Sequence, residues 1–170
     1  MNETLLFSET QKFKQWWIWL LLLGLNGTTL FGIYQQLFLD QQFGNKPLSD
    51  VSLIITGIFI SIITIIFLLF KLETHIKEDG IYVRFFPIHI SFRFYTWESI
   101  SKLEVREYKP IREYGGWGIR GFGKNRALNV SGNIGLQLEF KDGKKLLIGT
   151  NNSVELEKTI QEIKDTIKYT

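Results

Sequence analysis

The sequence contains no cysteine, which excludes disulfide bonds, zinc–cysteine sites, iron–sulfur sites and catalysis by a thiol. Histidine is also scarce. His75 and His89 are predicted to lie on separate strands without carboxylates at ligand spacing, so we expect no metal site. Neither Gly-x-Ser-x-Gly nor His-Glu-x-x-His occurs. These absences predict a protein that is not an enzyme and that has no cofactor.

Charge is absent from two long apolar runs, residues 16–39 and residues 51–70. About twenty apolar residues are needed for a helix to cross a bilayer, and only a helix satisfies its own backbone there. We therefore predict two spans at 16–39 and 51–70, forming a transmembrane hairpin over residues 16–70. The first run is longer than the apolar core of about 7–15 residues in a signal peptide, and no small-x-small site follows it. A retained anchor is preferred to cleavage.

Basic residues flank the hairpin on one side. Lys12 and Lys14 precede the first run, and Lys71, Lys77 and Arg84 follow the second, whereas the loop of residues 40–50 has one base and two acids. The positive-inside rule then places both termini in the cytoplasm. The predicted organisation is a cytoplasmic segment at 1–15, a hairpin at 16–70 and a cytosolic domain at 71–170.

Small residues recur at four-residue spacing within both runs, at Gly24, Thr28, Gly32, Gly57 and Ser61. Such ridges let helix backbones approach closely, so we predict that they pack the two spans together, with homodimerisation as the alternative. Asn26 is the one strongly polar residue near mid-span, and we expect it to donate a hydrogen bond between helices. With no ionisable group inside, the spans are predicted to be an anchor rather than a transport pathway.

After residue 71 the pattern changes to short segments of alternating polarity. Two-residue turn signals, Asp79-Gly80 and Asp142-Gly143, each lie between two such segments. About seven antiparallel strands are predicted, including segments 74–78, 81–86, 88–95, 100–108, 136–140 and 145–148. Residues 153–169 then follow a helical period, with Asn152 and Glu155 at capping-box spacing.

Three segments carry a resemblance to a known family: THIKEDGIYVRF at residues 74–85, WESISKLEVRE at 97–107 and LQLEFKDGKKLLIGT at 136–150. Together with the order of two spans, about seven strands and a C-terminal helix, they resemble the bacterial pleckstrin-homology-like domains that follow membrane hairpins. The resemblance implies a mainly-β domain at a bacterial inner membrane. It implies no catalytic or ligand residue.

The segment of residues 112–129, REYGGWGIRGFGKNRALN, is rich in glycine and interleaves aromatic with basic residues. The domain at 71–170 has seventeen basic and thirteen acidic residues, a net charge of +4, and the window 106–126 alone accounts for +4. Candidate membrane or partner contacts are Arg112, Tyr114, Trp117, Arg120, Phe122, Lys124 and Arg126.

Residues 118–125 nearly fit a P-loop, but Asn125 lacks the magnesium-binding hydroxyl and no helix is predicted to follow, so we expect no nucleotide.

Three interpretations of this segment stay open. Basic and aromatic side chains beside a membrane can bind anionic lipid headgroups. Alternatively, the glycines permit a tight crossing of the chain while Trp117 and Phe122 fill the core, or the segment contacts a protein.

Outside residues 112–129, acidic residues nearly balance basic ones, so we expect no nucleic-acid partner. The overall prediction is a non-enzymatic scaffold that holds a protein partner, another membrane protein or a second copy at the membrane. The alternative is sensing of anionic lipid through residues 112–129.

Overall fold

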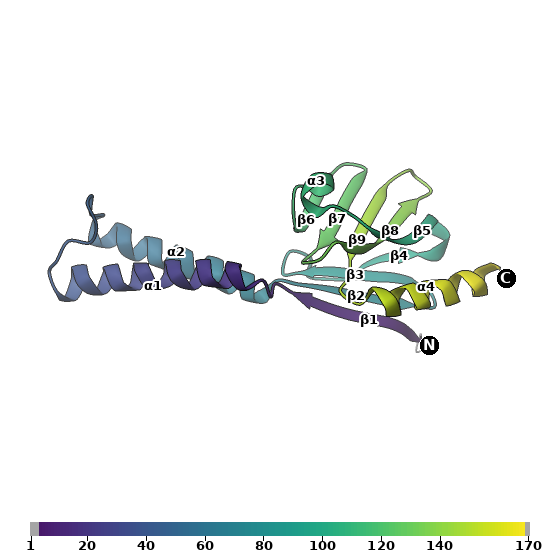
Figure 1. Cartoon of the computed structure of the whole chain (residues 1–170), viewed down its shortest axis with the longest axis horizontal. Helices are drawn as coiled ribbons and strands as arrows, with labels where there is room; N and C mark the ends of the chain where they lie inside the picture. The colour runs from purple at the N-terminus through teal and green to yellow at the C-terminus, as the bar shows by residue number, and fades with distance from the viewer. Residues whose placement is uncertain (1–3, 169–170) are drawn as a thin grey trace. The chain divides into compact units, whose positions relative to one another are not determined.

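The computed structural model describes residues 4–168, with side chains as far as Asp165, and divides the chain into two compact units (Figure 1). One unit comprises residues 14–69. The other combines the N-terminal residues up to Phe13 with the chain from Phe70 onward. The N-terminal segment thus belongs with the β domain, which the sequence did not predict.

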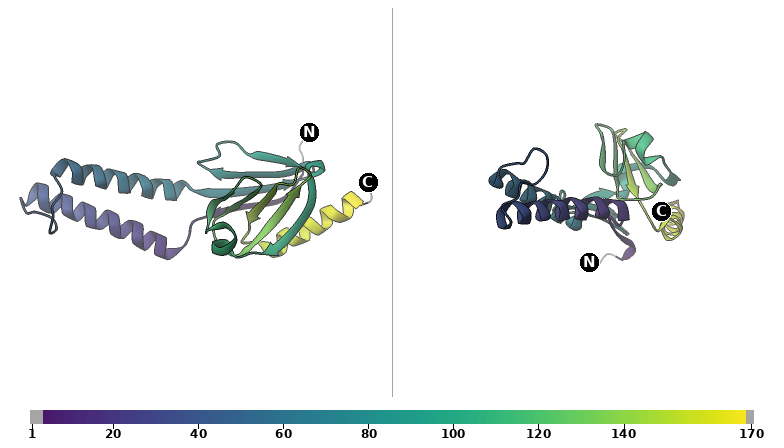
Figure 2. Two further views of the ribbon diagram at one scale, coloured as in Figure 1. Left: turned by 90° about the horizontal axis from the view of Figure 1, so that it is seen from above. Right: turned by 60° about the vertical axis from the view of Figure 1, so that its left-hand side comes forward.

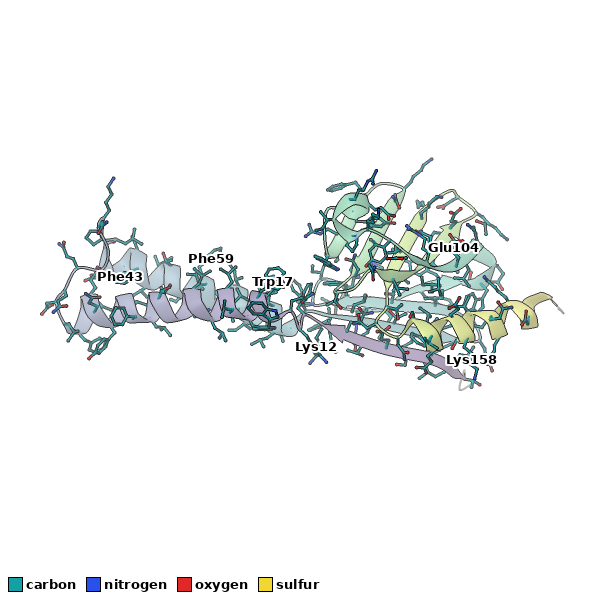
Figure 3. All side chains as sticks on the ribbon, viewed as in Figure 1. Lys12, Trp17, Phe43, Phe59, Glu104 and Lys158 are labelled. Carbon is teal, nitrogen blue, oxygen red and sulfur yellow. The ribbon has the colours of Figure 1, made fainter. Side chains whose placement is uncertain are left out.

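The first unit is a pair of long helices, α1 (Trp16–Phe38) and α2 (Asp50–Leu69). The helices lie side by side and antiparallel, joined by residues 39–49 (Figure 2). Both are long and apolar enough to cross a membrane. Most of their large apolar side chains are exposed; Phe59, for example, projects away from the pair and is 62% exposed (Figure 3). The predicted ends of the two runs agree with the helix ends to within one residue.

The second unit begins with a four-stranded antiparallel sheet in the order β1-β2-β3-β4. Its strands are β1 (Leu5–Lys12), β2 (Lys71–Lys77), β3 (Gly80–Phe86) and β4 (Arg93–Thr96). The strands β2 and β3 are joined by a two-residue turn, with Lys77 opposite Gly80. Gly80 is required at this point because a Cβ would collide with the backbone carbonyl of Tyr95 on β4.

A second sheet has five strands in the order β5-β8-β9-β7-β6. They are β5 (Ile100–Glu107), β6 (Gly118–Phe122), β7 (Asn125–Asn129), β8 (Ile134–Phe140) and β9 (Lys145–Gly149). A single 3-10 turn, η1 (Trp97–Ser99), links the sheets, and a short helix, α3 (Pro110–Tyr114), follows β5. The last strand, β9, lies between the consecutive strands β7 and β8; it runs antiparallel to β8 and parallel to β7.

The core lies between the inner faces of the two sheets and is closed by the C-terminal helix α4 (Ser153–Lys168) (Figure 1). Leu156, Ile160 and Ile163 of α4 are buried in the same cluster as residues of both sheets. Their spacing follows the helical period that predicted this element. Residue 169, the predicted end of the helix, lies outside the described residues.

The coarse prediction of two apolar helices, a mainly-β region and a C-terminal helix is confirmed. Three details differ. The described chain has nine strands rather than about seven, one pair is parallel rather than antiparallel, and only residues 93–95 of the predicted strand at 88–95 are in a strand, β4. Residues 87–92 instead form turns and bends, in which Ile88 and Ile90 are exposed and the polar His89 between them is buried.

Candidate functional site

The glycine-rich segment at 112–129 is not a loop. It contains the end of α3, then a hairpin of β6 and β7 in which Phe122 lies opposite Asn125. Gly115 ends α3 in the left-handed conformation, at φ 73°, and its amide donates to carbonyls of the helix. Residues 118–125 are therefore a strand and a tight turn, without the helix that a P-loop requires.

The seven predicted contact residues separate into different environments. Tyr114 is buried against Tyr108, Ala127 and Leu147, and its hydroxyl lies 3.5 Å from Arg106 and from Gln137. Trp117 is half-buried, and its Nε1 donates to the carbonyl of Gly132 at 3.0 Å. The exposed side chains are those of Arg112 on α3 and of Arg120, Phe122, Lys124 and Arg126 on the hairpin.

Phe122 is 97% exposed, at the turn of the β6–β7 hairpin. The expectation that Trp117 and Phe122 fill the core is therefore wrong for Phe122. A fully exposed phenylalanine among basic residues fits contact with a lipid interface or a partner better than it fits core packing. Strand burial could not be inferred from the sequence here, because the glycines interrupt the alternation of polarity.

A polar cleft of about 420 Å³ lies on the second sheet, lined in part by Glu104, Arg106, Glu113, Gln137 and Lys145 (Figure 3 labels Glu104). The guanidinium of Arg106 donates to Glu113 at 2.8 Å and to Gln137 Oε1 at 3.0 Å. The hydrogen bond from Arg106 lowers the pKa of the Glu113 carboxyl. The spacing of these residues in the sequence did not predict that they converge.

Each carboxylate of this cleft is paired with a base. Glu104 is bridged to Lys102, Glu113 to Arg106, and Glu139 to Lys145. The Lys102–Glu104 and Lys145–Glu139 pairs are largely exposed and balance charge at little gain in stability, whereas Arg106 is less exposed and is held by both Glu113 and Gln137. In the described part of the chain, no group of three or more histidine and acidic side chains is arranged to hold a metal ion.

His75 lies on a strand, as predicted, whereas His89 does not. His75 lies on β2 with its ring 4.9 Å from that of Phe92. His89 lies in the turn after β3 rather than on a strand, is buried, and accepts a hydrogen bond at Nδ1 from the backbone amide of Phe85 at 3.3 Å. Burial, together with the charges of Arg93 and Arg126, lowers the pKa of His89.

One end of the first sheet carries a cluster of basic and aromatic side chains that the sequence did not reveal. Lys71 and Arg84 both bind the carboxylate of Glu73, at 3.0 Å and 2.7 Å. Burial acts to raise the pKa of Glu73, but hydrogen bonds from the two bases outweigh it and the pKa is lowered. The same bases lie over aromatic rings, Lys71 over Phe86 and Arg84 over Phe92.

In the helical unit, the expected hydrogen bond of Asn26 is present. Its Nδ2 donates to Thr64 Oγ1 at 2.8 Å, and its Oδ1 accepts from Ser61 at 3.0 Å. Gly57 also lies in the interface, because a Cβ there would approach Ile33 and Thr29 at 3.1 Å and 3.2 Å. Asn26 thus links α1 to two residues of α2.

The other predicted packing residues have different roles. Gly32 packs against the Phe43 ring of the connecting loop. Gly24 has open space around its Cα, and exposed Thr28 bonds to carbonyls of its own helix. The ridge predicted on α1 therefore does not form the interface along its whole length. The contacting face of α1 instead includes Asn26, Thr29 and Ile33.

In comparisons with known proteins, no family model, no curated protein and no solved structure matches the chain. The resemblance to pleckstrin-homology-like domains therefore remains a prediction from the residues that carry it.

Proposed function

We propose that the protein is a membrane-anchored, non-enzymatic binding protein that presents its β domain at the cytoplasmic face of a bacterial inner membrane. One observation carries the proposal: the apolar helix pair is inserted between two paired strands. The chain leaves β1 at Lys12, passes through α1 and α2, and returns at Lys71, which lies directly opposite Lys12.

This pairing supports a hairpin that crosses the bilayer twice. Adjacent residues of one sheet lie on one side of a membrane, so the chain must leave and return on that side. It also argues against a cleaved signal peptide, because cleavage after the first apolar helix would remove β1 from its sheet. The side chains of Asn26, Ser61 and Thr64 satisfy each other between the helices, as expected of an anchor.

The orientation is inferred from charge. Lys12, Lys14 and Lys71 lie at the open end of the helix pair, and positive charge favours the cytoplasmic side. Trp16 and Trp17, at the start of α1, are exposed residues of the type that forms interfacial belts. The two-sheet architecture with a C-terminal helix supports a pleckstrin-homology-like domain as the part exposed to the cytoplasm.

Cysteine accessibility tests the topology, since the natural chain has no cysteine. Asn45→Cys, in the loop between the helices, should react with an impermeant maleimide added to intact cells. Asp142→Cys, in the β8–β9 turn, should react only after permeabilisation. Labelling of Asp142→Cys in intact cells would refute the proposed orientation.

A protein partner or a second copy is the proposed ligand of the β domain. The charge-paired cleft supports this role, because Arg106 is held by Glu113 and Gln137 in a position that a complementary surface can recognise. Photo-crosslinking from Lys145, replaced by a photoreactive amino acid in native membranes, should give a discrete adduct. A band at twice the mass of the chain would identify self-association. The absence of any adduct from this position would count against the cleft.

Headgroup recognition by the β6–β7 hairpin is a second candidate function, favoured by the complete exposure of Phe122. The full chain should be mixed with vesicles that either contain or lack anionic lipid. The amount of each kind of vesicle that the protein captures is then compared. Replacement of Arg112, Arg120, Lys124 and Arg126 by serine should abolish capture of anionic vesicles. Equal capture of neutral vesicles by the natural chain would contradict this function.

A further inference from the structure

We propose that the turn between β3 and β4 is an interfacial membrane contact, in which Ile88 and Ile90 enter the boundary between headgroups and acyl chains. The inference rests on the proposed function, because it requires α1 and α2 to span the bilayer. It concerns residues outside the glycine-rich segment.

Covalent connectivity fixes the location of this turn. The last residue of α2 is Leu69, and Lys71 begins β2 two residues later. Two extended residues reach about 7 Å at most. Phe86, the last residue of β3, lies directly opposite Lys71. The end of β3, and the turn that follows it, are therefore held within a few residues of the point where the chain leaves the apolar span.

The side chains of the turn suit a lipid interface. Ile88 is 59% exposed and Ile90 is 80% exposed. Between them, His89 is buried, with its amide donating to the carbonyl of Phe85 at 2.8 Å. Arg84 also donates to the carbonyl of Ile90 at 3.2 Å. Hydrogen bonds within the β domain thus hold the turn with its two isoleucines exposed. Because the turn is already ordered, little conformational entropy is lost when it contacts the membrane.

Charge around the turn favours an anionic bilayer over an apolar protein groove. Lys12, Lys71, Arg84 and Arg93 surround this end of the sheet, whereas Glu73 is the one acid there among the described residues and is neutralised by two of them. Apolar side chains ringed by bases are the combination that binds interfaces of anionic lipid. The aromatic rings of Phe86 and Phe92 lie under these bases.

Depth-dependent fluorescence quenching tests the contact in the full chain. Ile90→Cys is labelled with an environment-sensitive fluorophore and reconstituted in vesicles that contain phosphatidylglycerol and spin-labelled lipid. Phe59→Cys, on the exposed face of α2, reports insertion of the span. Glu78→Cys is the matched control, because it lies in the turn at the other end of β2 and β3. The two ends of β2, Lys71 and Lys77, are six residues and therefore about 20 Å apart.

The expected result is quenching of the Ile90 probe by a spin label near the headgroups, quenching of the Phe59 probe by a deep label, and no quenching at Glu78. Quenching at Phe59 without quenching at Ile90 would overturn the contact while leaving the anchor intact. Absence of quenching at both would overturn the anchor as well. Shielding of Ile90 from aqueous iodide without lipid quenching would show that protein covers the turn, which also contradicts the inference.

Discussion

Lys12 and Lys71 lie directly opposite each other across β1 and β2, although 58 residues of chain separate them. The helix pair is therefore an insertion into a hairpin-like strand pair, and the first strand of the β domain is made before the membrane segment. Folding of the β domain requires the chain on both sides of the hairpin. Contacts along β1 should consequently control the stability of the whole second unit.

Phe7 provides the test of β1. Its side chain is 2% exposed, lies opposite Ile76 and belongs to the main core cluster. Phe7→Ala should destabilise the β domain by about 3–5 kcal/mol, because a large buried side chain is lost and a cavity remains. Leu5→Ala on the same strand, at a 52% exposed side chain, is the control and should change stability by less than about 0.5 kcal/mol. Thermal unfolding in detergent, followed by near-UV circular dichroism, measures both; equal melting temperatures would show that β1 is dispensable.

Asn26 should contribute to stability of the helix pair. Asn26→Leu removes the bonds to Ser61 and Thr64 and should cost about 1 kcal/mol, the typical value for a polar bond between membrane helices. Thr28→Ala removes a hydroxyl that bonds only within α1 and serves as the matched change. Titration of mixed micelles with dodecyl sulfate, followed by tryptophan fluorescence, gives the two unfolding free energies. The interpretation fails if the alanine variant loses as much stability as the leucine variant.

Gly121 and Gly123 differ in what surrounds them. Both have positive φ, +79° and +60°, but a Cβ on Gly121 would collide with the backbone of Asn125, whereas Gly123 has open space. Gly123→Ala should cost about 1 kcal/mol, from conformation alone. Gly121→Ala should cost about 1–3 kcal/mol more, because the β6–β7 pair must separate. Chemical denaturation of the two variants measures the difference, and similar midpoints would mean that the hairpin opens easily.

His89 should make stability depend on pH. Its folded pKa is lowered below the ordinary value of 6.5, mainly by burial, so the unfolded chain binds a proton first as the pH falls. Stability is therefore complete above about pH 6.5 and is lost as the pH falls toward the folded pKa. Protonation of Nδ1 would also break the bond from the Phe85 amide.

His89→Asn keeps an acceptor for that amide and should reduce the fall in melting temperature between pH 7.5 and 5.5. His75 is shifted in the same direction, also by burial, so His75→Asn measures its separate share. An unchanged pH dependence in His89→Asn would show that another group controls this range.

The sequence predicted the elements whose pattern is local. The ends of α1 and α2 follow from uncharged apolar runs, and the turn near Asp79-Gly80 from its residue types. The face of α4 follows from the spacing of Leu156, Ile160 and Ile163. Asn26 could be assigned to the interface because a polar side chain in an apolar run has few other ways to be satisfied.

The sequence was less informative where polarity and burial disagree. The alternation around Ile88 and Ile90 predicted a buried strand face, yet these side chains are exposed in a turn. Tyr114 and Phe122 looked alike as aromatic residues between glycines, but one is buried and the other is 97% exposed. Their environments depend on how the β6–β7 hairpin pairs with β9, which is a contact between distant segments.

By itself, the sequence determined that two uncharged apolar runs form helices and precede a β region with a C-terminal helix. Only the tertiary structure decided that residues 5–12 belong to that β region and that Lys71, Arg84 and Phe86 meet at the end of the sheet where the apolar pair is inserted. The physical reason is that helix formation and tight turns depend on neighbouring residues, whereas strand partners are chosen by packing across the whole domain.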